Sequence, residues 1–272
     1  MWFPFAFLGY ACLSVVSILD KFILSKEKVK PSLLVFYSTI FLAPLLLAFP
    51  FLQTRPTGFL WLIIILAATA FVVSLFAIYT AYSKSEVSHT GPFVGGLTPL
   101  FILILSELFL REQILKPQLF GIFLLCSGTL LISFQKSSSK NTLKGLMWAM
   151  LSAFIFAIFH VGSKYVYSVI GFGSGFIYIW GVMGIFGLLM FSLEDVRKVV
   201  FPHHTWWSKV AGKFHTAPKI KAEVISIVSN KFLSVASIIS IQFAASIGSV
   251  TRVNALSGVR ENDFSHVFKR EH

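Results

Sequence analysis

The chain has 272 residues, of which 56% are hydrophobic, only 12% are charged and 30 are phenylalanine. A soluble domain carries about 25% charged residues, so this composition excludes an ordinary soluble domain and indicates a polytopic membrane protein. The formal net charge of +12 does not indicate nucleic-acid binding, because the basic residues lie between apolar segments, where the positive-inside rule expects them.

Eight segments are apolar enough to cross a bilayer, or nearly so, since a spanning helix needs about twenty mostly apolar residues. They run from about Trp2 to Leu24, Ser32 to Leu52, Gly58 to Tyr82, Val87 to Leu110, Pro117 to Ser133, Leu143 to Ile170, Phe172 to Leu193 and Phe232 to Gly248. The sequence therefore predicts an all-α polytopic transmembrane helix bundle in contact with the lipid bilayer. We expect multi-pass insertion in the cell (plasma or inner) membrane, and we leave a homodimer open.

The fourth segment carries Pro92, Gly95, Gly96 and Pro99 in its first half. Gly and Pro are tolerated inside a spanning helix where neighbouring helices or a cavity satisfy the freed backbone groups. We predict that the helix is broken or kinked there, that the glycines let a neighbour approach closely, and that the segment lines a substrate path. Packing alone is the alternative explanation for all four residues.

Two pairs of segments in the two halves of the chain are similar. Asp20-Lys21-Phe22 matches Ser163-Lys164-Tyr165, and the stretch from Ala81 to Ser88 matches the stretch from Ala244 to Thr251. Such matches indicate an internal duplication. An odd number of helices in each half inverts the second half relative to the first, which is a common construction of transporters.

The fourth and fifth segments resemble the EamA-like branch of the drug/metabolite transporter superfamily. The resemblance rests on Ala81-Tyr82-Ser83 to Val87-Ser88, Pro99, Leu110-Arg111-Glu112, Gln118, Gly121 and Gly128. It implies a transporter of two inverted five-helix repeats, ten helices in all. The corresponding domains here are a first repeat at 1–135, a linker at 136–142, an incomplete second repeat at 143–259 and a charged tail at 260–272. The sequence departs from the family pattern after Val259, and we interpret the second repeat as truncated.

Lys and Arg gather in the odd-numbered connections between the segments, which by the positive-inside rule predicts an N-terminus outside the cytoplasm. The family usually has its N-terminus inside. The longest connection runs from Glu194 to Asn230, and its last part, Lys219 to Val228, has apolar residues at helical spacing. This part is either an amphipathic helix on the membrane surface or a run-in to the eighth span.

Ionisable residues within spans are costly and are therefore candidates for function. Asp20 and Lys21 near the end of the first span favour an interfacial pair. Glu107 favours an ion pair with Arg111, four residues later, over a proton-coupling or cation-binding role. Glu112 is expected to organise its turn. Lys164 lies on the helix face of His160, a residue that suits either substrate binding or an interhelical hydrogen bond.

Other polar and small residues of the spans complete the candidate substrate path: Tyr79, Tyr82, Thr90, Thr98 and Gln242. Cys12 and Cys126 lie in apolar segments and are expected to be packing residues. His203 and His204 have no cysteine or acidic partner at ligand spacing, so we predict no metal and no cofactor.

The leading hypothesis is a secondary transporter that moves a small organic metabolite or drug-like solute by alternating access, since the chain has no Walker-type glycine loop for ATP. The alternative is a truncated paralogue that inserts in the membrane but does not transport. An intramembrane enzyme is disfavoured, because neither a HExxH motif nor the paired aspartates of a prenyl-pyrophosphate enzyme occurs in the chain.

Overall fold

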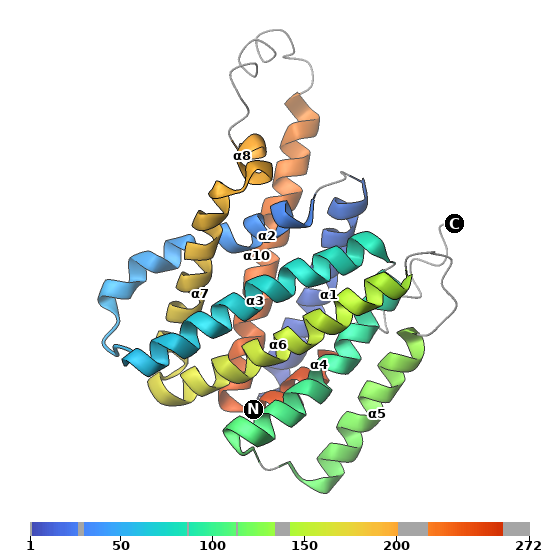
Figure 1. The fold of residues 1–272 in the computed structure, drawn as a ribbon, viewed down its shortest axis with the longest axis vertical. Coiled ribbons are helices and arrows are strands. Elements are labelled where there is room, and N and C mark those ends of the chain that lie inside the picture. The colour runs from blue at the N-terminus through green and yellow to red at the C-terminus, as the bar shows by residue number, and fades with distance from the viewer. Residues whose placement is uncertain are drawn as a thin grey trace.

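The helices of the computed structural model form a bundle in which distant parts of the chain lie side by side (Figure 1). The structure describes residues 2–26, 30–85, 87–112, 114–133, 142–200 and 217–257; within these, only the backbone is described for 21–26, 87–88, 118, 132–133, 142, 198–200 and 217–228. The elements are α1 (Phe3–Lys26), α2 (Pro31–Ile40), η1 (Ala43–Phe51), α3 (Gly58–Lys84), α4 (Val87–Leu110), α5 (Lys116–Ser133), α6 (Thr142–Ile170), α7 (Phe172–Leu189), η2 (Met190–Ser192), α8 (Glu194–Val200), α10 (Ala217–Ile247) and α11 (Val250–Ala255).

The predicted all-α polytopic bundle is confirmed, but the described residues give seven helices that are long and apolar enough to span a membrane, not eight. The remaining predicted span is α5 (Lys116–Ser133), in which Leu119–Leu131 is the apolar stretch whose side chains are all described. This helix lies at the edge of the bundle, against α4 and α11 (Figure 1).

The second span is not one α-helix, as its composition predicted. It consists of α2 followed by the 3-10 helix η1. The change from α-helix to 3-10 helix begins with two hydrogen bonds that span three residues: Leu42 N donates to Thr39 O, and Leu45 N donates to Leu42 O. Pro44 enters η1 and Pro50 lies inside it. The ring of a proline inside an α-helix clashes with the carbonyl four residues earlier, so two prolines six residues apart disfavour a continuous α-helix over this stretch.

The prolines of α4 do not break it, and the predicted kink stays a prediction. The helix runs without interruption from Val87 to Leu110, with Pro92 and Pro99 buried inside it. The interruption lies earlier, at Ser85, between α3 and α4. The close approach predicted for Gly96 is confirmed: a Cβ there would lie 2.6 Å from Thr129 Oγ1 of α5.

The eighth span begins far earlier than Phe232. Helix α10 starts at Ala217 and runs to Ile247, while α8 occupies the start of the predicted long connection. The stretch Lys219–Val228 is thus continuous with the span, in agreement with the run-in interpretation. Asn230 and Lys231, which were expected in a connection, lie inside α10. His203 and His204 fall outside the described residues.

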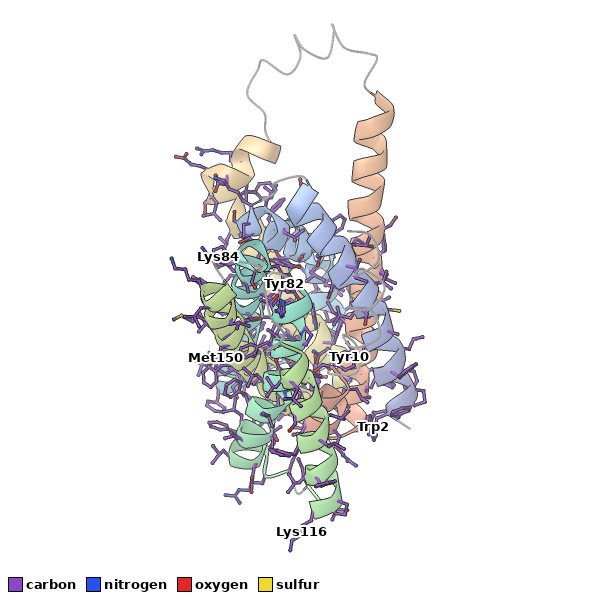
Figure 2. All side chains as sticks on the ribbon, turned by 90° about the vertical axis from the view of Figure 1, so that its right-hand side faces the viewer. Trp2, Tyr10, Tyr82, Lys84, Lys116 and Met150 are labelled. Atoms are coloured by element: carbon purple, nitrogen blue, oxygen red, sulfur yellow. The ribbon has the colours of Figure 1, made fainter. Side chains whose placement is uncertain are left out.

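Helices from the two halves of the chain are paired with each other. Helix α1 packs along α10, and α3 packs along α6, while α7 lies against η1, α3 and α2. In the view of Figure 2, α10 extends along one side of the bundle and α1 lies beside it, with Tyr10 and Tyr82 in the interior and Lys116 at the lower end. The largest core cluster joins α3, α6 and α7 through Phe71, Phe159 and Trp180.

Glycines let α7 contact the backbone of its neighbours. A Cβ at Gly184 would lie 2.6 Å from Ala43 Cα, and one at Gly187 would lie 2.8 Å from Ile40 N. Backbone atoms cannot rotate away as a flexible side chain can. Close approach of this kind, through small residues, is how helices pack where lipid surrounds them.

We predict that Gly187→Ala destabilises the protein by about 1–3 kcal/mol, the usual cost of overpacking. The measurement is the midpoint of thermal unfolding in detergent. Gly173→Ala in the same helix is the matched control, because a Cβ there meets nothing within 4 Å and alanine is the better helix former. An equal effect of the two substitutions would contradict this packing.

Candidate functional site

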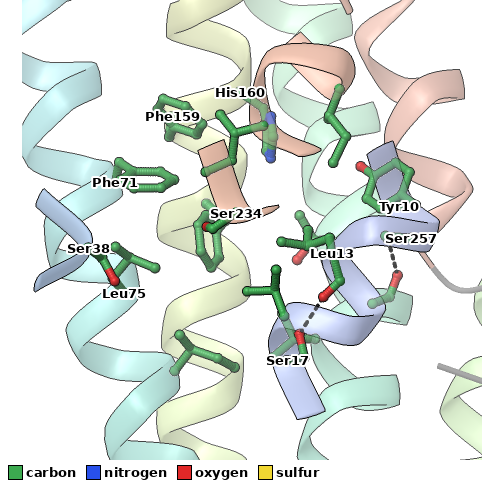
Figure 3. Close-up of a pocket in the computed structure, with 18 of the residues that line it drawn as sticks. Tyr10, Leu13, Ser17, Ser38, Phe71, Leu75, Phe159, His160, Ser234 and Ser257 are labelled. Atoms are coloured by element: carbon green, nitrogen blue, oxygen red, sulfur yellow. Dashed lines mark hydrogen bonds between the residues drawn. The ribbon is translucent and has the colours of Figure 1, made fainter. Parts of the chain in front are cut away.

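A cavity of about 160 Å³ lies at the centre of the bundle (Figure 3). Helices α1, α3, α4, α6 and α10 each contribute several residues to its wall, and α2, α7 and α11 contribute one each. On α1 the lining residues are Tyr10, Leu13, Val16, Ser17 and Asp20, which share one helix face. From Tyr10 to Asp20 the helix rises about 15 Å, so the cavity extends along about half the thickness of a bilayer.

Aromatic rings form much of the cavity wall. Phe71 and Phe159 have ring centroids 4.8 Å apart, and Phe71 lies 5.0 Å from Trp180. His160 lies beside Phe159, with its ring centroid 5.0 Å away. In Figure 3 Phe71, Phe159 and His160 extend from α3 and α6 into the same space. Offset and edge-to-face arrangements of this kind stabilise a core and give it a definite shape.

A buried ion pair lies at one end of the cavity. Lys231 Nζ of α10 is 3.1 Å from Asp20 Oδ1 of α1, and the two side chains are only 3% and 6% exposed. The same carboxylate accepts hydrogen bonds from Asn230 Nδ2 at 2.8 Å and from Tyr79 OH at 3.2 Å. Lys231 also donates to Ser38 Oγ at 3.0 Å. Three helices therefore meet at this carboxylate, and α2 joins the network through Ser38.

This network corrects the expectation of an interfacial Asp20–Lys21 pair. Asp20 is buried and pairs with a lysine 211 residues away, while the side chain of Lys21 lies outside the described part of the chain. Each charge compensates the other, and the hydrogen bonds satisfy the remaining polar atoms of the carboxylate. A buried ion pair offsets the cost of removing its two charges from water only when further hydrogen bonds satisfy both groups, as they do here.

Removing one charge of the pair should destabilise the protein strongly. Asp20→Asn or Lys231→Met alone leaves a buried charge without its partner, at a cost of about 3–5 kcal/mol. The double variant Asp20→Asn/Lys231→Met removes both charges and should be more stable than either single variant. Thermal unfolding of all four proteins in detergent measures the coupling; strictly additive effects would contradict the pair.

Two charged side chains of opposite sign hold the interruption between α10 and α11. Lys164 Nζ, from α6, donates to the carbonyls of Ala245, Ser246 and Gly248 at 2.8, 3.0 and 2.7 Å. These carbonyls are at the carboxyl end of α10, where the helix dipole is negative and the last carbonyls have no partner within the helix. Lys164 therefore satisfies them with a charge of the appropriate sign.

Glu112 places a negative charge at the amino end of α11, where the helix dipole is positive. Its Oε2 accepts a hydrogen bond from Ser249 Oγ at 2.6 Å and its Oε1 accepts one from Val250 N at 3.2 Å. The preceding residue, Arg111, has φ of 51°, an uncommon conformation for a non-glycine residue, and it turns the chain toward α11. The expected Glu107–Arg111 ion pair is absent: both residues are described, both are exposed, and no salt bridge joins them.

Helix α11 lies at the other end of the cavity and is held there by single hydrogen bonds. Tyr10 OH of α1 donates to Asn254 Oδ1 at 2.8 Å, and Ser106 Oγ lies 2.9 Å from Thr251 Oγ1. Just beyond the helix, Ser257 Oγ donates to the carbonyl of Gly95 at 3.0 Å. Asn254 and Ser257 line the cavity, so α11 forms one end of it.

Lys164→Met should destabilise the protein by at least about 1.5 kcal/mol, the lower end for one hydrogen bond to a charged group, because three carbonyls lose the same donor. Lys144→Met is the matched control: Lys144 is on the same helix but exposed. Thermal unfolding in detergent compares the two variants, and equal stability would contradict the role of Lys164.

The structure brings together six of the predicted path residues at the cavity wall: Tyr79, Tyr82, Gly95, Thr98, His160 and Gln242. Four others do not line it: Thr90, Pro92, Gly96 and Pro99. Of the ionisable candidates, Asp20 lines the cavity, Lys164 and Glu112 hold the α10–α11 interruption, and Glu107 is exposed.

Several important residues were not predicted. Lys231 and Asn230 were assigned to a connection, although apolar residues at helical spacing stand on both sides of them and could have placed them inside a helix. Tyr10, Phe71, Phe159 and Trp180 gave no signal, because they are four among many aromatic residues of the spans. Asn254 was hidden by its position in the six-residue helix α11.

Comparison with known proteins agrees with this architecture. A crystal structure described only as that of a protein superposes with a TM-score of 0.62 and 16% sequence identity, covering 94% of this chain and 82% of the other. That similarity concerns the fold alone, and it extends over both halves of the chain. No curated protein matches the sequence.

The first half of the chain matches a known family. Residues 1–134 match the model of the EamA-like transporter family. The family implies a multi-pass membrane transporter of the drug/metabolite type rather than an enzyme. It does not favour the alternative of a paralogue that inserts without transporting.

Proposed function

We propose that the protein is a secondary transporter that carries small organic solutes across the cell membrane by alternating access through the central cavity. One observation carries the proposal: the cavity lies between two separate polar closures. The Asp20–Lys231 network is at one end, and α11 with its hydrogen bonds to α1 and α4 is at the other.

Alternating access needs a closure at each end that can open without unfolding the bundle. Both ends meet this condition, since each is held by hydrogen bonds or one ion pair between different helices. The interruption at residues 248 and 249, between α10 and α11, supplies a joint at which α11 can move separately from α10. Interrupted helices beside the binding site are a recurrent feature of such transporters.

The paired helices support an inverted-repeat mechanism. In two inverted five-helix repeats, α1 and α6 are equivalent, as are α3 and α10. The contacts α1–α10 and α3–α6 are then the same contact made twice, and one repeat can rock against the other along both.

A disulfide across α11 tests the proposal. Ser106→Cys/Thr251→Cys joins two positions whose hydroxyl oxygens are 2.9 Å apart, close enough for a disulfide. Thr98→Cys reports access to the cavity, in a background of Cys12→Ser and Cys126→Ala. We expect a membrane-impermeant maleimide to label Thr98→Cys from either side of the membrane when the disulfide is reduced, and from one side only when it is oxidised.

Ser152→Cys is the matched control, because Ser152 is fully buried but lies outside the cavity and should stay unlabelled. Recovery of labelling after reduction distinguishes a locked protein from a misfolded one. Labelling of Thr98→Cys from the same single side whether or not the disulfide is formed would contradict alternating access.

A further inference from the structure

Charge in the cavity wall is already balanced. Among the described lining residues the only carboxylate is Asp20, and it is neutralised by Lys231 and hydrogen bonded by Asn230 and Tyr79. No lysine or arginine lines the cavity in this part of the chain. His160 has no carboxylate partner, and a buried charge without a partner is costly, so we treat its imidazole as neutral.

Four lining side chains carry polar atoms without a hydrogen-bond partner among the described residues. They are Thr98 Oγ1 of α4, His160 Nδ1 of α6, Trp180 Nε1 of α7 and Gln242 Oε1 of α10. Nearly all buried polar atoms in proteins are paired, so each exception needs an explanation. Four exceptions from four helices around one cavity are explained together if a solute supplies the partners.

The remaining wall and the volume limit the shape of that solute. Phe71, Phe156, Phe159 and Trp180 offer ring faces and edges to it. An apolar cavity of about 150 Å³ accommodates a benzene molecule, and this cavity has about 160 Å³. One ring with a small polar substituent therefore fits.

We propose that the cavity selects small, uncharged single-ring compounds that carry both a hydrogen-bond donor and an acceptor. The inference rests on the proposed transport function and names the substrate class for the same cavity. The donor of the solute pairs with Gln242 Oε1, and Thr98 and His160 each supply a donor or an acceptor. Anions and cations are excluded because neither finds an unpaired counter-charge in the wall.

Three ring compounds of nearly identical shape test this selection: benzamide, which is neutral, benzoate, which is an anion, and benzamidinium, which is a cation. The reporter is Ser234→Cys in the background without Cys12 and Cys126, because Ser234 lines the cavity but is not one of the four residues with an unpaired polar atom. We expect benzamide to slow maleimide labelling of Ser234→Cys in a saturable way, and the two ions to have no effect at the same concentration.

Gln242→Leu should weaken protection by benzamide by about tenfold, the effect of losing one hydrogen bond near the upper end of its usual range. Ser240→Ala on the same helix is the control, because Ser240 does not line the cavity and its hydroxyl donates to the carbonyl of Ala236 in its own helix, and it should leave the protection unchanged. The comparison of the three probes on one protein needs no variant at position 242, so a folding defect of Gln242→Leu does not affect it.

Protection by benzoate or benzamidinium equal to that by benzamide would overturn the selection for uncharged solutes. Labelling of Ser234→Cys that none of the three compounds slows would overturn the proposed substrate class, while leaving transport of another solute intact. Labelling of Thr98→Cys from the same single side whether or not the Ser106→Cys/Thr251→Cys disulfide is formed is the separate failure that contradicts the transport function itself.

Discussion

The rest of the structure depends on how an ammonium group is accommodated inside a membrane-spanning helix. Lys231 of α10 is almost completely buried, and an unpaired charge at that position would be too costly to keep. Asp20 supplies the opposite charge, and Ser38, Tyr79 and Asn230 satisfy the remaining hydrogen bonds. The requirement to compensate one charge therefore sets the relative positions of α1, α2, α3 and α10.

The same helix carries a second electrostatic constraint at its other end. The carboxyl end of α10 and the amino end of α11 face each other across the interruption at residues 248 and 249, and their dipoles require charges of opposite sign. Lys164 and Glu112 provide them, from α6 and from the α4–α5 connection. Between the two constraints, Ser234, Ile238, Ile241 and Gln242 of α10 line the cavity. Helix α10 thus links both ends of the cavity to its wall.

Hydropathy alone predicted most of the helices, because lipid and the bundle core both demand apolar residues over the length of a span. Hydropathy failed where a proline or a charged residue lies within or beside an apolar run. The prolines of η1 were overlooked within an apolar run, those of α4 do not interrupt their helix, and Lys231 was assigned to the connection before the eighth span although α10 continues through it.

Some of the polar residues of the cavity wall were predicted, because a polar side chain within a span is costly and therefore a candidate for function. The partners of those residues were not predicted. Asp20 meets Lys231 across 211 positions, and Glu112 meets Val250 across 138; such pairs follow from the packing of whole helices, which one sequence does not specify. Glu112 was expected to organise its own turn, whereas its contacts are with an element of the other half.

The central claim is that the two ends of the cavity open in turn, and the distance across the Asp20–Lys231 end tests it most directly. Ser83 and Ser229 are exposed residues on α3 and α10 near that end, so spin labels at Ser83→Cys and Ser229→Cys, without Cys12 and Cys126, report its width by pulsed electron paramagnetic resonance in lipid. The account predicts two populated distances whose proportions change when benzamide is added. A single narrow distance that benzamide leaves unchanged would contradict it.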